Sequence, residues 1–204
     1  MLRLRPADHT SAKVETYSLR VPQVRWLNWI RDPYGNRVAR ATFHPEHPVT
    51  SVDVEVELAV DIRPVNPFDF FIEDDAEMFP FAYPDAMRRE LSPFLGLTTA
   101  PVASGERFEA FVQGLEKRGK TIDVVVAVNR AVKERLDYVI RNEVGVWTPE
   151  ETLREGKGSC RDSAMLLVAC FRRMGLAARF VSGYLVQIED EGHLPDEPKG
   201  MDHD

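Results

Sequence analysis

The pattern of hydrophobic and polar positions changes character near residue 83. Before this point, apolar residues recur at every second position. The clearest case is 51–62, where polar residues alternate with Val52, Val54, Val56, Leu58, Val60 and Ile62. Such alternation is typical of a strand with one buried and one solvated face. Tyr17, Leu19 and Val21 alternate in the same way. We expect residues 1–83 to form a small antiparallel sheet or sandwich.

A turn signal and two tryptophans refine this β region. The run Asp32-Pro33-Tyr34-Gly35-Asn36 has the composition of a tight turn and would join strands over 26–30 and 37–43. Trp26 and Trp29 fall on the first of these strands. We expect them to pack in the core, and the alternative is an exposed recognition patch. Residues 73–77 carry four acidic side chains, which we interpret as a solvated loop rather than a cation site.

From Asp85 onward the spacing becomes helical, and residues 84–204 are predicted to form a second domain. Helices are expected over 85–91, from Ser104 to about Arg118, and from about Ile122 to Ile140. The third helix has apolar residues three or four positions apart, which predicts one buried face. That face comprises Val125, Val128, Val132, Leu136 and Val139.

Two helix starts are marked by capping signals. In Thr148-Pro149-Glu150-Glu151 a threonine precedes a glutamate by three residues, with proline at the first helical position, and the helix should end at Gly156. Ser159 and Asp162 repeat this spacing before an apolar run from Ala164 to Phe171. A helix that is apolar nearly all round is buried on most sides. A strand is expected after it, over 178–188.

This arrangement places Cys160 in the first turn of the buried helix. Unpaired N–H groups and the helix dipole favour the thiolate there, and the same N–H groups suit a developing oxyanion on an attacked carbonyl. No base accompanies the cysteine. Helix placement alone therefore leaves open the alternative that Cys160 is a small core residue, which is the role that we expect for Cys170.

Composition excludes several classes of function. The net charge of −7 argues against nucleic acid as a partner. There is no apolar run near 18 residues and no signal-peptide pattern at the start, so no membrane partner is expected. The two cysteines would lie about 15 Å apart on one helix, too far for a disulfide, which favours a reducing, cytoplasmic location. They lack zinc-site spacing, so neither a metal nor a cofactor is expected.

Three segments, 148–153, 156–164 and 173–184, resemble the transglutaminase-like superfamily, in particular its bacterial branch with a β-rich N-terminal region. The resemblance covers most of the chain and is densest over 148–184. It implies an α+β fold, with an N-terminal antiparallel β-sheet or sandwich followed by the helical front half of a papain-like core. It also implies that Cys160 is the nucleophile of a Cys-His-Asp triad, whose His and Asp lie downstream of residues 179–184.

The end of the sequence departs from the family pattern. The family's His is usually followed by Ala-Trp and its Asp by Pro, whereas His193 here precedes Leu194 and His203 precedes the final Asp204. We therefore expect this chain to be a fragment that is inactive by itself. An unpaired edge after 178–188 would favour self-association.

The functional hypothesis is that the parent protein is a cysteine-dependent acyl-transfer enzyme. It would act on amide bonds of a protein or peptide through a thioester at Cys160, as a peptidase or amidase rather than a crosslinking transglutaminase. Trp147, Gly158, Ser159 and Arg161 flank the cysteine and are candidate substrate-binding residues, although core packing is the alternative for Trp147. The competing hypothesis is a non-catalytic binding or scaffolding module with a degenerate transglutaminase-like fold.

Overall fold

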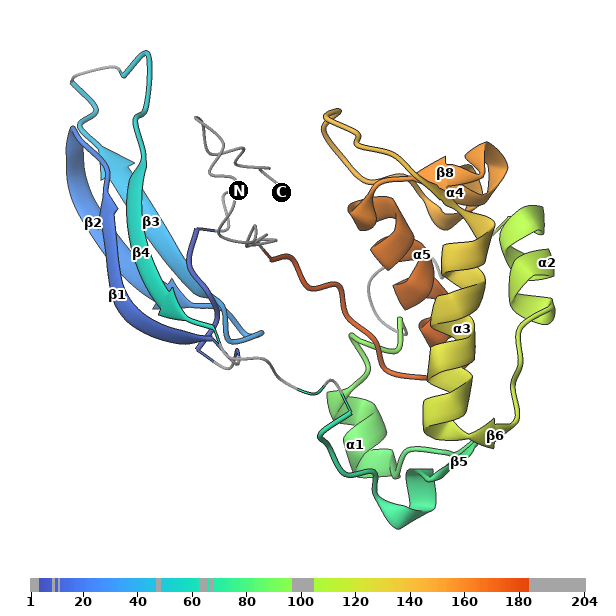
Figure 1. The fold of residues 1–204 in the computed structure, drawn as a ribbon. Helices are drawn as coiled ribbons and strands as arrows, with labels where there is room; N and C mark the ends of the chain where they lie inside the picture. The colour runs from blue at the N-terminus through green and yellow to red at the C-terminus, as the bar shows by residue number, and fades with distance from the viewer. Residues whose placement is uncertain are drawn as a thin grey trace, which may run out of the picture. The chain divides into compact units, whose positions relative to one another are not determined.

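We describe the fold from a computed structural model over residues 4–8, 10, 12–46, 49–62, 66, 68–96 and 105–183. The chain divides into two compact units, one formed by Phe71–Val181 and the other by Met1–Phe70 with Ser182–Asp204. Strands occupy the first unit and helices dominate the second (Figure 1), so the predicted α+β class is confirmed. The domain boundary at residue 83 stays a prediction.

The described residues of the first unit form two antiparallel strand pairs. Strand β1 (Lys13–Arg20) pairs with β4 (Glu55–Asp61), and β2 (Val24–Arg31) pairs with β3 (Arg37–Phe43). The Asp32 side chain accepts hydrogen bonds from the backbone N–H groups of Tyr34 and Asn36, at 2.9 and 2.8 Å. These bonds close the hairpin between β2 and β3, so the predicted turn is confirmed.

The predicted buried faces of the β region are only partly buried. Strand β4 begins at Glu55 rather than at residue 51, and Leu58 is 37% exposed. Trp26 is 60% exposed, so the expectation that it packs in a core is wrong. Trp29, 42% exposed, makes an edge-on contact with Tyr17 at a centroid distance of 5.9 Å. A two-stranded sheet has too little apolar surface to bury one face completely.

The described residues of the second unit form five helices and two short strand pairs. The helices are α1 (Asp85–Glu90), α2 (Glu106–Gln113), α3 (Thr121–Arg135), α4 (Pro149–Glu155) and α5 (Cys160–Arg173). A 3₁₀ turn, η1 (Asp74–Ala76), precedes the first strand pair. In that pair β5 (Met78–Phe79) is antiparallel to β6 (Gly119–Lys120), and in the second β7 (Asp137–Tyr138) is parallel to β8 (Lys157–Gly158).

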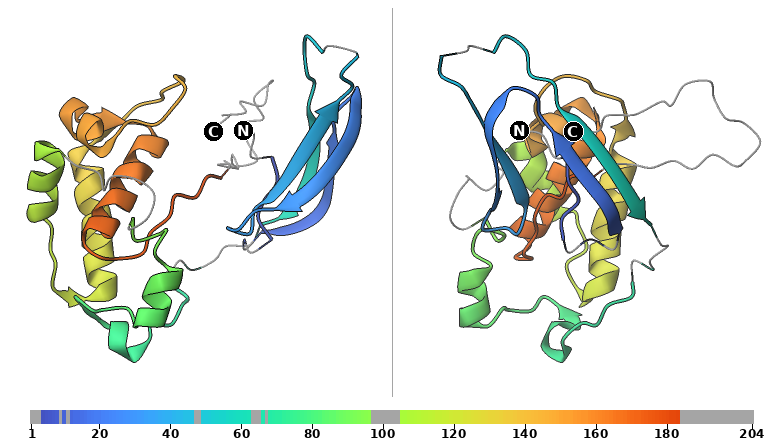
Figure 2. Two further views of the ribbon diagram at one scale, coloured as in Figure 1. Left: turned by 180° about the vertical axis from the view of Figure 1, so that it is seen from behind. Right: turned by 90° about the vertical axis from the view of Figure 1, so that its left-hand side faces the viewer.

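Helix α5 lies at the centre of the hydrophobic core. It contacts α3 and α4, and Figure 2 shows α3 and α5 side by side. Leu166 and Cys170 of α5 have no exposed surface. They belong to one buried cluster with Phe79, Phe108, Val112, Val124, Val128, Val132, Leu153, Ala169 and Leu176. The prediction of a buried helix is thus confirmed, and so is core packing of Cys170.

Two helices are shorter than predicted. Helix α2 ends at Gln113 rather than near Arg118, and the predicted cap Ser104 lies outside the described residues. Helix α3 ends at Arg135 because Leu136 takes an extended conformation (ψ 131°) that leads into β7. Its buried residues are Val124, Val128 and Val132, whereas the predicted Val125 is 36% exposed.

The segment after α5 also differs from the prediction. Residues 178–183 are not part of a strand, and 184–188 lie outside the described residues. The Ala178 N–H donates to the Phe94 carbonyl at 3.0 Å. Across the described ranges, no helix is both long and apolar enough to cross a membrane.

Candidate active site

Cys160 is the first residue of α5 and is exposed to solvent. Ser159 is the N-cap with extended dihedral angles (φ −77°, ψ 174°), as the sequence predicted, and is 4% exposed. The chain reaches this cap directly from β8. A central buried helix therefore holds a thiol at its solvent-accessible N-terminal end.

Gly158 positions this helix start through close packing. Its carbonyl accepts a hydrogen bond from the Val139 N–H at 3.0 Å, which extends the β7–β8 pairing. A Cβ atom at this position would lie 3.0 Å from the Asp162 Cβ and 3.5 Å from the Thr152 Cγ2. The glycine thus allows the strand to approach the first turn of α5.

Asp162 has no exposed surface and accepts hydrogen bonds from three residues around the start of α5. Its Oδ2 accepts hydrogen bonds from the Ser159 N–H at 2.9 Å and the Ser159 hydroxyl at 2.8 Å, and its Oδ1 accepts one from the Trp147 N–H at 2.8 Å. Arg141 donates Nε to Oδ2 at 3.0 Å and Nη2 to Oδ1 at 3.1 Å. Buried polar groups need such partners because an unmade hydrogen bond is costly. Both oxygens of this carboxylate are therefore satisfied.

Electrostatics keep Asp162 ionised. Burial raises its pKa, but the Arg141 guanidinium and the donors from Trp147 and Ser159 outweigh burial and lower the pKa to about 2. The same carboxylate raises the pKa of Arg141. At neutral pH Asp162 is a fully engaged anion, so it does not act as a proton acceptor for the neighbouring thiol.

Two arginines link the loop over 139–147 to the start of α5 through hydrogen bonds. The Arg141 guanidinium lies 4.3 Å above the Trp147 ring, at cation–π distance, and its Nη2 also donates to the Gly145 carbonyl at 2.9 Å. Arg161 Nη2 donates to the Arg141 carbonyl at 2.8 Å. The half-buried Trp147 ring packs against Arg141, in line with the packing alternative.

The sequence-predicted site residues therefore cluster at one place. Gly158 and Ser159 are buried supports, Cys160 is exposed, and Arg161 and Trp147 contact the adjoining loop. The roles of these residues towards a substrate stay predictions. The first N–H groups of α5 lack intrahelical acceptors by geometry, so they are suited to hold an oxyanion beside the thiol.

The unit that holds Cys160 contains no histidine, since none occurs in the sequence between residues 71 and 181. Within the part of the chain that the structure describes, no group of three or more His, Cys, Asp or Glu residues could hold a metal ion. The unit thus places an exposed thiol at a helix N-terminus, and no histidine of the same unit accompanies it.

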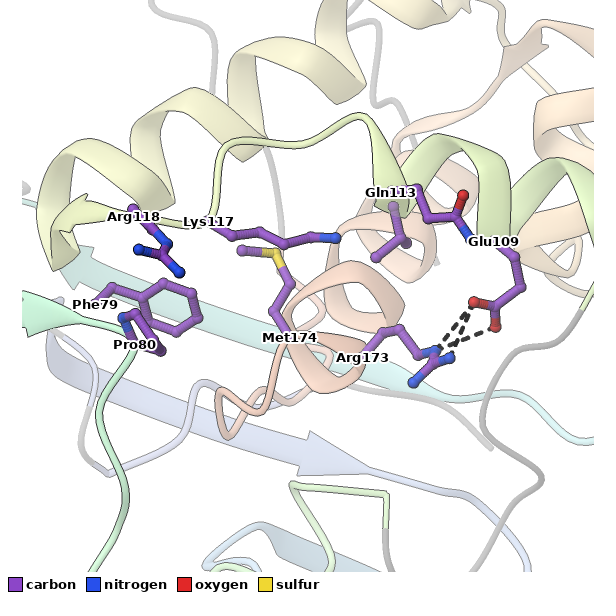
Figure 3. Close-up of a pocket in the computed structure, with 9 residues that line it drawn as sticks. Phe79, Pro80, Glu109, Gln113, Lys117, Arg118, Arg173 and Met174 are labelled. Atoms are coloured by element: carbon purple, nitrogen blue, oxygen red, sulfur yellow. Dashed lines mark hydrogen bonds and ion pairs between the residues drawn. The ribbon is translucent and has the colours of Figure 1, made fainter.

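A pocket of about 480 Å³ lies at the opposite end of α5 (Figure 3), lined in part by Arg173 and Met174. The thirteen-residue separation between Cys160 and Arg173 corresponds to about 20 Å along a helix axis. This pocket is therefore separate from the cysteine site.

Comparison with known proteins agrees with this geometry. Residues 109–198 match the family described as transglutaminase-like superfamily, and residues 1–61 match the bacterial transglutaminase-like N-terminal region. The chain belongs to the transglutaminase-like superfamily. The two matches confirm the predicted family. This family is one of cysteine-dependent enzymes.

The curated relatives are mycobacterial. An uncharacterized protein of Mycobacterium tuberculosis H37Rv and one of Mycobacterium bovis are each 30% identical over 164 residues, which cover 76% of this chain and 49% of the relative. An uncharacterized Mycobacterium leprae protein is 34% identical over 88 residues, covering 43% of this chain and 31% of its own. The chain spans about half the length of the first two relatives.

A solved structure shares the fold. The crystal structure of a Cytophaga hutchinsonii protein described as a "putative cysteine protease" superposes with a TM-score of 0.58 at 18% identity, covering 84% of this chain and 57% of that chain. This likeness confirms the predicted transglutaminase-like, papain-type fold.

Sequence reasoning missed two supporting residues, Arg141 and Glu150. Arg141 lies 21 positions before its partner Asp162, beyond the reach of local patterns. Glu150 accepts hydrogen bonds from the N–H groups of Arg107 and Phe108, at 3.3 and 2.9 Å, and so caps α2 from another helix.

Proposed function

We propose that this chain carries the nucleophile of a bacterial cysteine-dependent acyl-transfer enzyme that cleaves amide bonds in proteins or peptides. The observation that supports this proposal is the exposed Cys160 at the first position of α5, next to the buried Asp162 network. A nucleophile on a rigid, internally fixed helix start is held in place for attack. Both cysteines of this chain are free thiols, which fits a protein of the reducing cytoplasm.

In the proposed reaction the Cys160 sulfur attacks the carbonyl carbon of an amide. The C–N bond breaks, the amine leaves with a proton, and a thioester remains on the sulfur. Water then attacks the thioester and releases a carboxylic acid, which makes the enzyme a peptidase or amidase. The N–H groups at the start of α5 hold the oxygen anion that forms in each step. The thiol proton goes to a histidine that the family places after residues 179–184, oriented by an aspartate.

A non-catalytic binding module is the second candidate. The observation that favours it is the absence of histidine between residues 71 and 181, so the unit around Cys160 has no base of its own. The two candidates differ in whether the complete protein supplies a histidine that reaches the Cys160 sulfur. The chain spans about half the length of the first two relatives, so the two candidates have to be distinguished in the complete protein.

The test uses the complete gene product. Peptide or amide hydrolysis is followed through release of the amine, and Cys160→Ala is compared with Cys170→Ala. The first variant removes the nucleophile and should lower kcat by at least about a thousand-fold. The second changes a buried thiol in the same helix and should retain turnover in whatever fraction remains folded. Unchanged turnover in Cys160→Ala would overturn the enzyme proposal.

A further inference from the structure

The pocket at the far end of α5 is formed where three parts of the second unit meet. Phe79 and Pro80 come from the end of β5, Gln113 and Lys117 from the end of α2 and the turn that follows it, and Met174 from the end of α5. Figure 3 shows Phe79 and Pro80 on one side of the Lys117 side chain and Gln113 on the other. A volume of about 480 Å³ falls within the usual range for small-ligand sites.

One part of the pocket lining is apolar and fixed. Phe79 is 6% exposed and Val112 is 5% exposed, and both belong to the main hydrophobic cluster. Met174 packs against that cluster and lines the pocket as well. An apolar group of a ligand would therefore rest on rigid, already packed side chains. Methionine adds an adaptable surface for groups of differing shape.

The other part of the lining is positively charged. Lys117, Arg118 and Arg173 line the pocket with one carboxylate, that of Glu109. Glu109 binds Arg173 through hydrogen bonds of 3.0 to 3.3 Å, so these two charges neutralise each other. Lys117 and Arg118 have no side-chain ion pair or hydrogen bond with any described residue. The pocket is thus cationic although the chain carries a net charge of −7.

Backbone groups near the pocket are already occupied. The N–H groups of Lys117 and Arg118 donate to the Glu116 carboxylate at 2.9 and 3.1 Å. The N–H groups of Met174 and Gly175 donate hydrogen bonds to backbone carbonyls in the last turn of α5. Recognition of a ligand therefore falls to the side chains, namely the two cations that have no partner among the described residues and the exposed Gln113 amide.

We propose that this pocket binds the carboxylate of an apolar acid, in the form presented by the C-terminal residue of a peptide. Lys117 and Arg118 hold the carboxylate, Phe79 and Met174 contact the apolar side chain, and Gln113 hydrogen-bonds the preceding peptide group. A simple phosphate would use the charges but leave the apolar surface bare, and a cation would be repelled. The proposal does not depend on chemistry at Cys160.

The experiment is a titration of the ¹⁵N-labelled chain, followed by backbone amide NMR shifts. The probes are N-acetyl-phenylalanine, its neutral amide, phenylacetate and inorganic phosphate. The expected result is saturable binding of N-acetyl-phenylalanine, with shifts centred on residues 79, 113 and 174. Phenylacetate should bind several-fold more weakly because it has no peptide group, and the neutral amide at least about ten-fold more weakly because it has no charge.

Three variants assign the charges. The double variant Lys117→Gln with Arg118→Gln should weaken binding of N-acetyl-phenylalanine by about ten-fold or more. Glu109→Gln should tighten it by a few-fold because Arg173 then becomes available. Lys120→Gln changes an exposed lysine outside the pocket and should leave affinity unchanged.

Several results would overturn the proposal. These are no saturable binding of N-acetyl-phenylalanine, equal affinity for its neutral amide, tighter binding of phosphate than of the acid, or an equal loss in Lys120→Gln. Binding of phenylacetate as tight as that of N-acetyl-phenylalanine would contradict the peptide form and identify a site for free apolar acids instead.

Discussion

Asp162 and Arg141 form a two-point ion pair, with Nε to Oδ2 at 3.0 Å and Nη2 to Oδ1 at 3.1 Å. The Asp162 side chain is fully buried and the Arg141 side chain is 9% exposed. This geometry matches the planar fork of arginine to the two carboxylate oxygens. The pair joins the loop over 139–147 to the first turn of α5, and Asp162 lies two residues after Cys160 in that turn.

Removing one member of this pair should be costly. Asp162→Ala would leave the nearly buried Arg141 guanidinium with only the exposed Glu143 carboxylate as counter-ion. It would also leave the donors of Ser159 and Trp147 without their acceptor. We expect the free energy of unfolding to fall by roughly 3–5 kcal/mol, measured by urea denaturation. Glu143→Gln is the matched control because that carboxylate is 73% exposed and 3.6 Å from Arg141. It should change stability by less than about 0.5 kcal/mol, and an equal loss in both variants would refute the central role of Asp162.

The same carboxylate should make stability depend on acid pH. Its pKa is depressed from 3.8 to about 2 in the folded protein, so the unfolded chain takes up the proton first as pH falls. The contribution is complete above about pH 5, declines as the pH falls through 4 to 2, and is lost below about pH 1; at full size it amounts to roughly 2.5 kcal/mol. Other carboxylates also titrate, so the difference in stability between the native chain and Asp162→Asn isolates this one. A flat difference between pH 5 and 2 would contradict the assignment.

Gly158→Ala tests the close approach of β8 to α5. The new methyl group would meet the Asp162 Cβ at 3.0 Å, so the fixed carboxylate would have to shift by a few tenths of an ångström. We expect a loss of about 1–3 kcal/mol in the free energy of unfolding. Gly183→Ala is the control, because a Cβ there has no described atom within 4 Å. Equal stability of Gly158→Ala and the native chain would mean that this contact is easily relieved.

The two thiols should differ greatly in reactivity. Cys160 is exposed, whereas Cys170 is fully buried and burial raises its pKa to about 12. Iodoacetamide at pH 8 should modify Cys160 at least about a hundred-fold faster than Cys170, as read by peptide mass spectrometry. The unfolded protein should show similar rates at both positions. Equal rates in the folded protein would contradict the exposed placement of Cys160.

Local signals in the sequence predicted the frame of the site well. Thr148 and Glu151 form the predicted capping box, and Gly156 ends α4 in the left-handed region at φ 64°. Ser159 caps α5 at the predicted residue. These interactions span three or four residues, so their partners can be identified from spacing alone.

Interactions between distant segments were beyond such reasoning. The bonds from Arg141 to Asp162 and from Glu150 to the start of α2 join residues 21 and more than 40 positions apart. Helix α3 stops at Arg135 because the next residues pair with β8, although the apolar spacing continues to Val139. Tertiary pairing there outweighs helical propensity, and the sequence pattern contains no sign of the partner strand.

The most direct test of the proposed chemistry is to capture the acyl intermediate. The complete gene product would be mixed with a peptide substrate, quenched in acid within the first turnovers, digested and mapped by mass spectrometry. The proposal predicts an acyl adduct on the peptide that contains Cys160, absent from Cys160→Ala and present in Cys170→Ala. Turnover without an adduct on Cys160, or with the adduct on another residue, would contradict it.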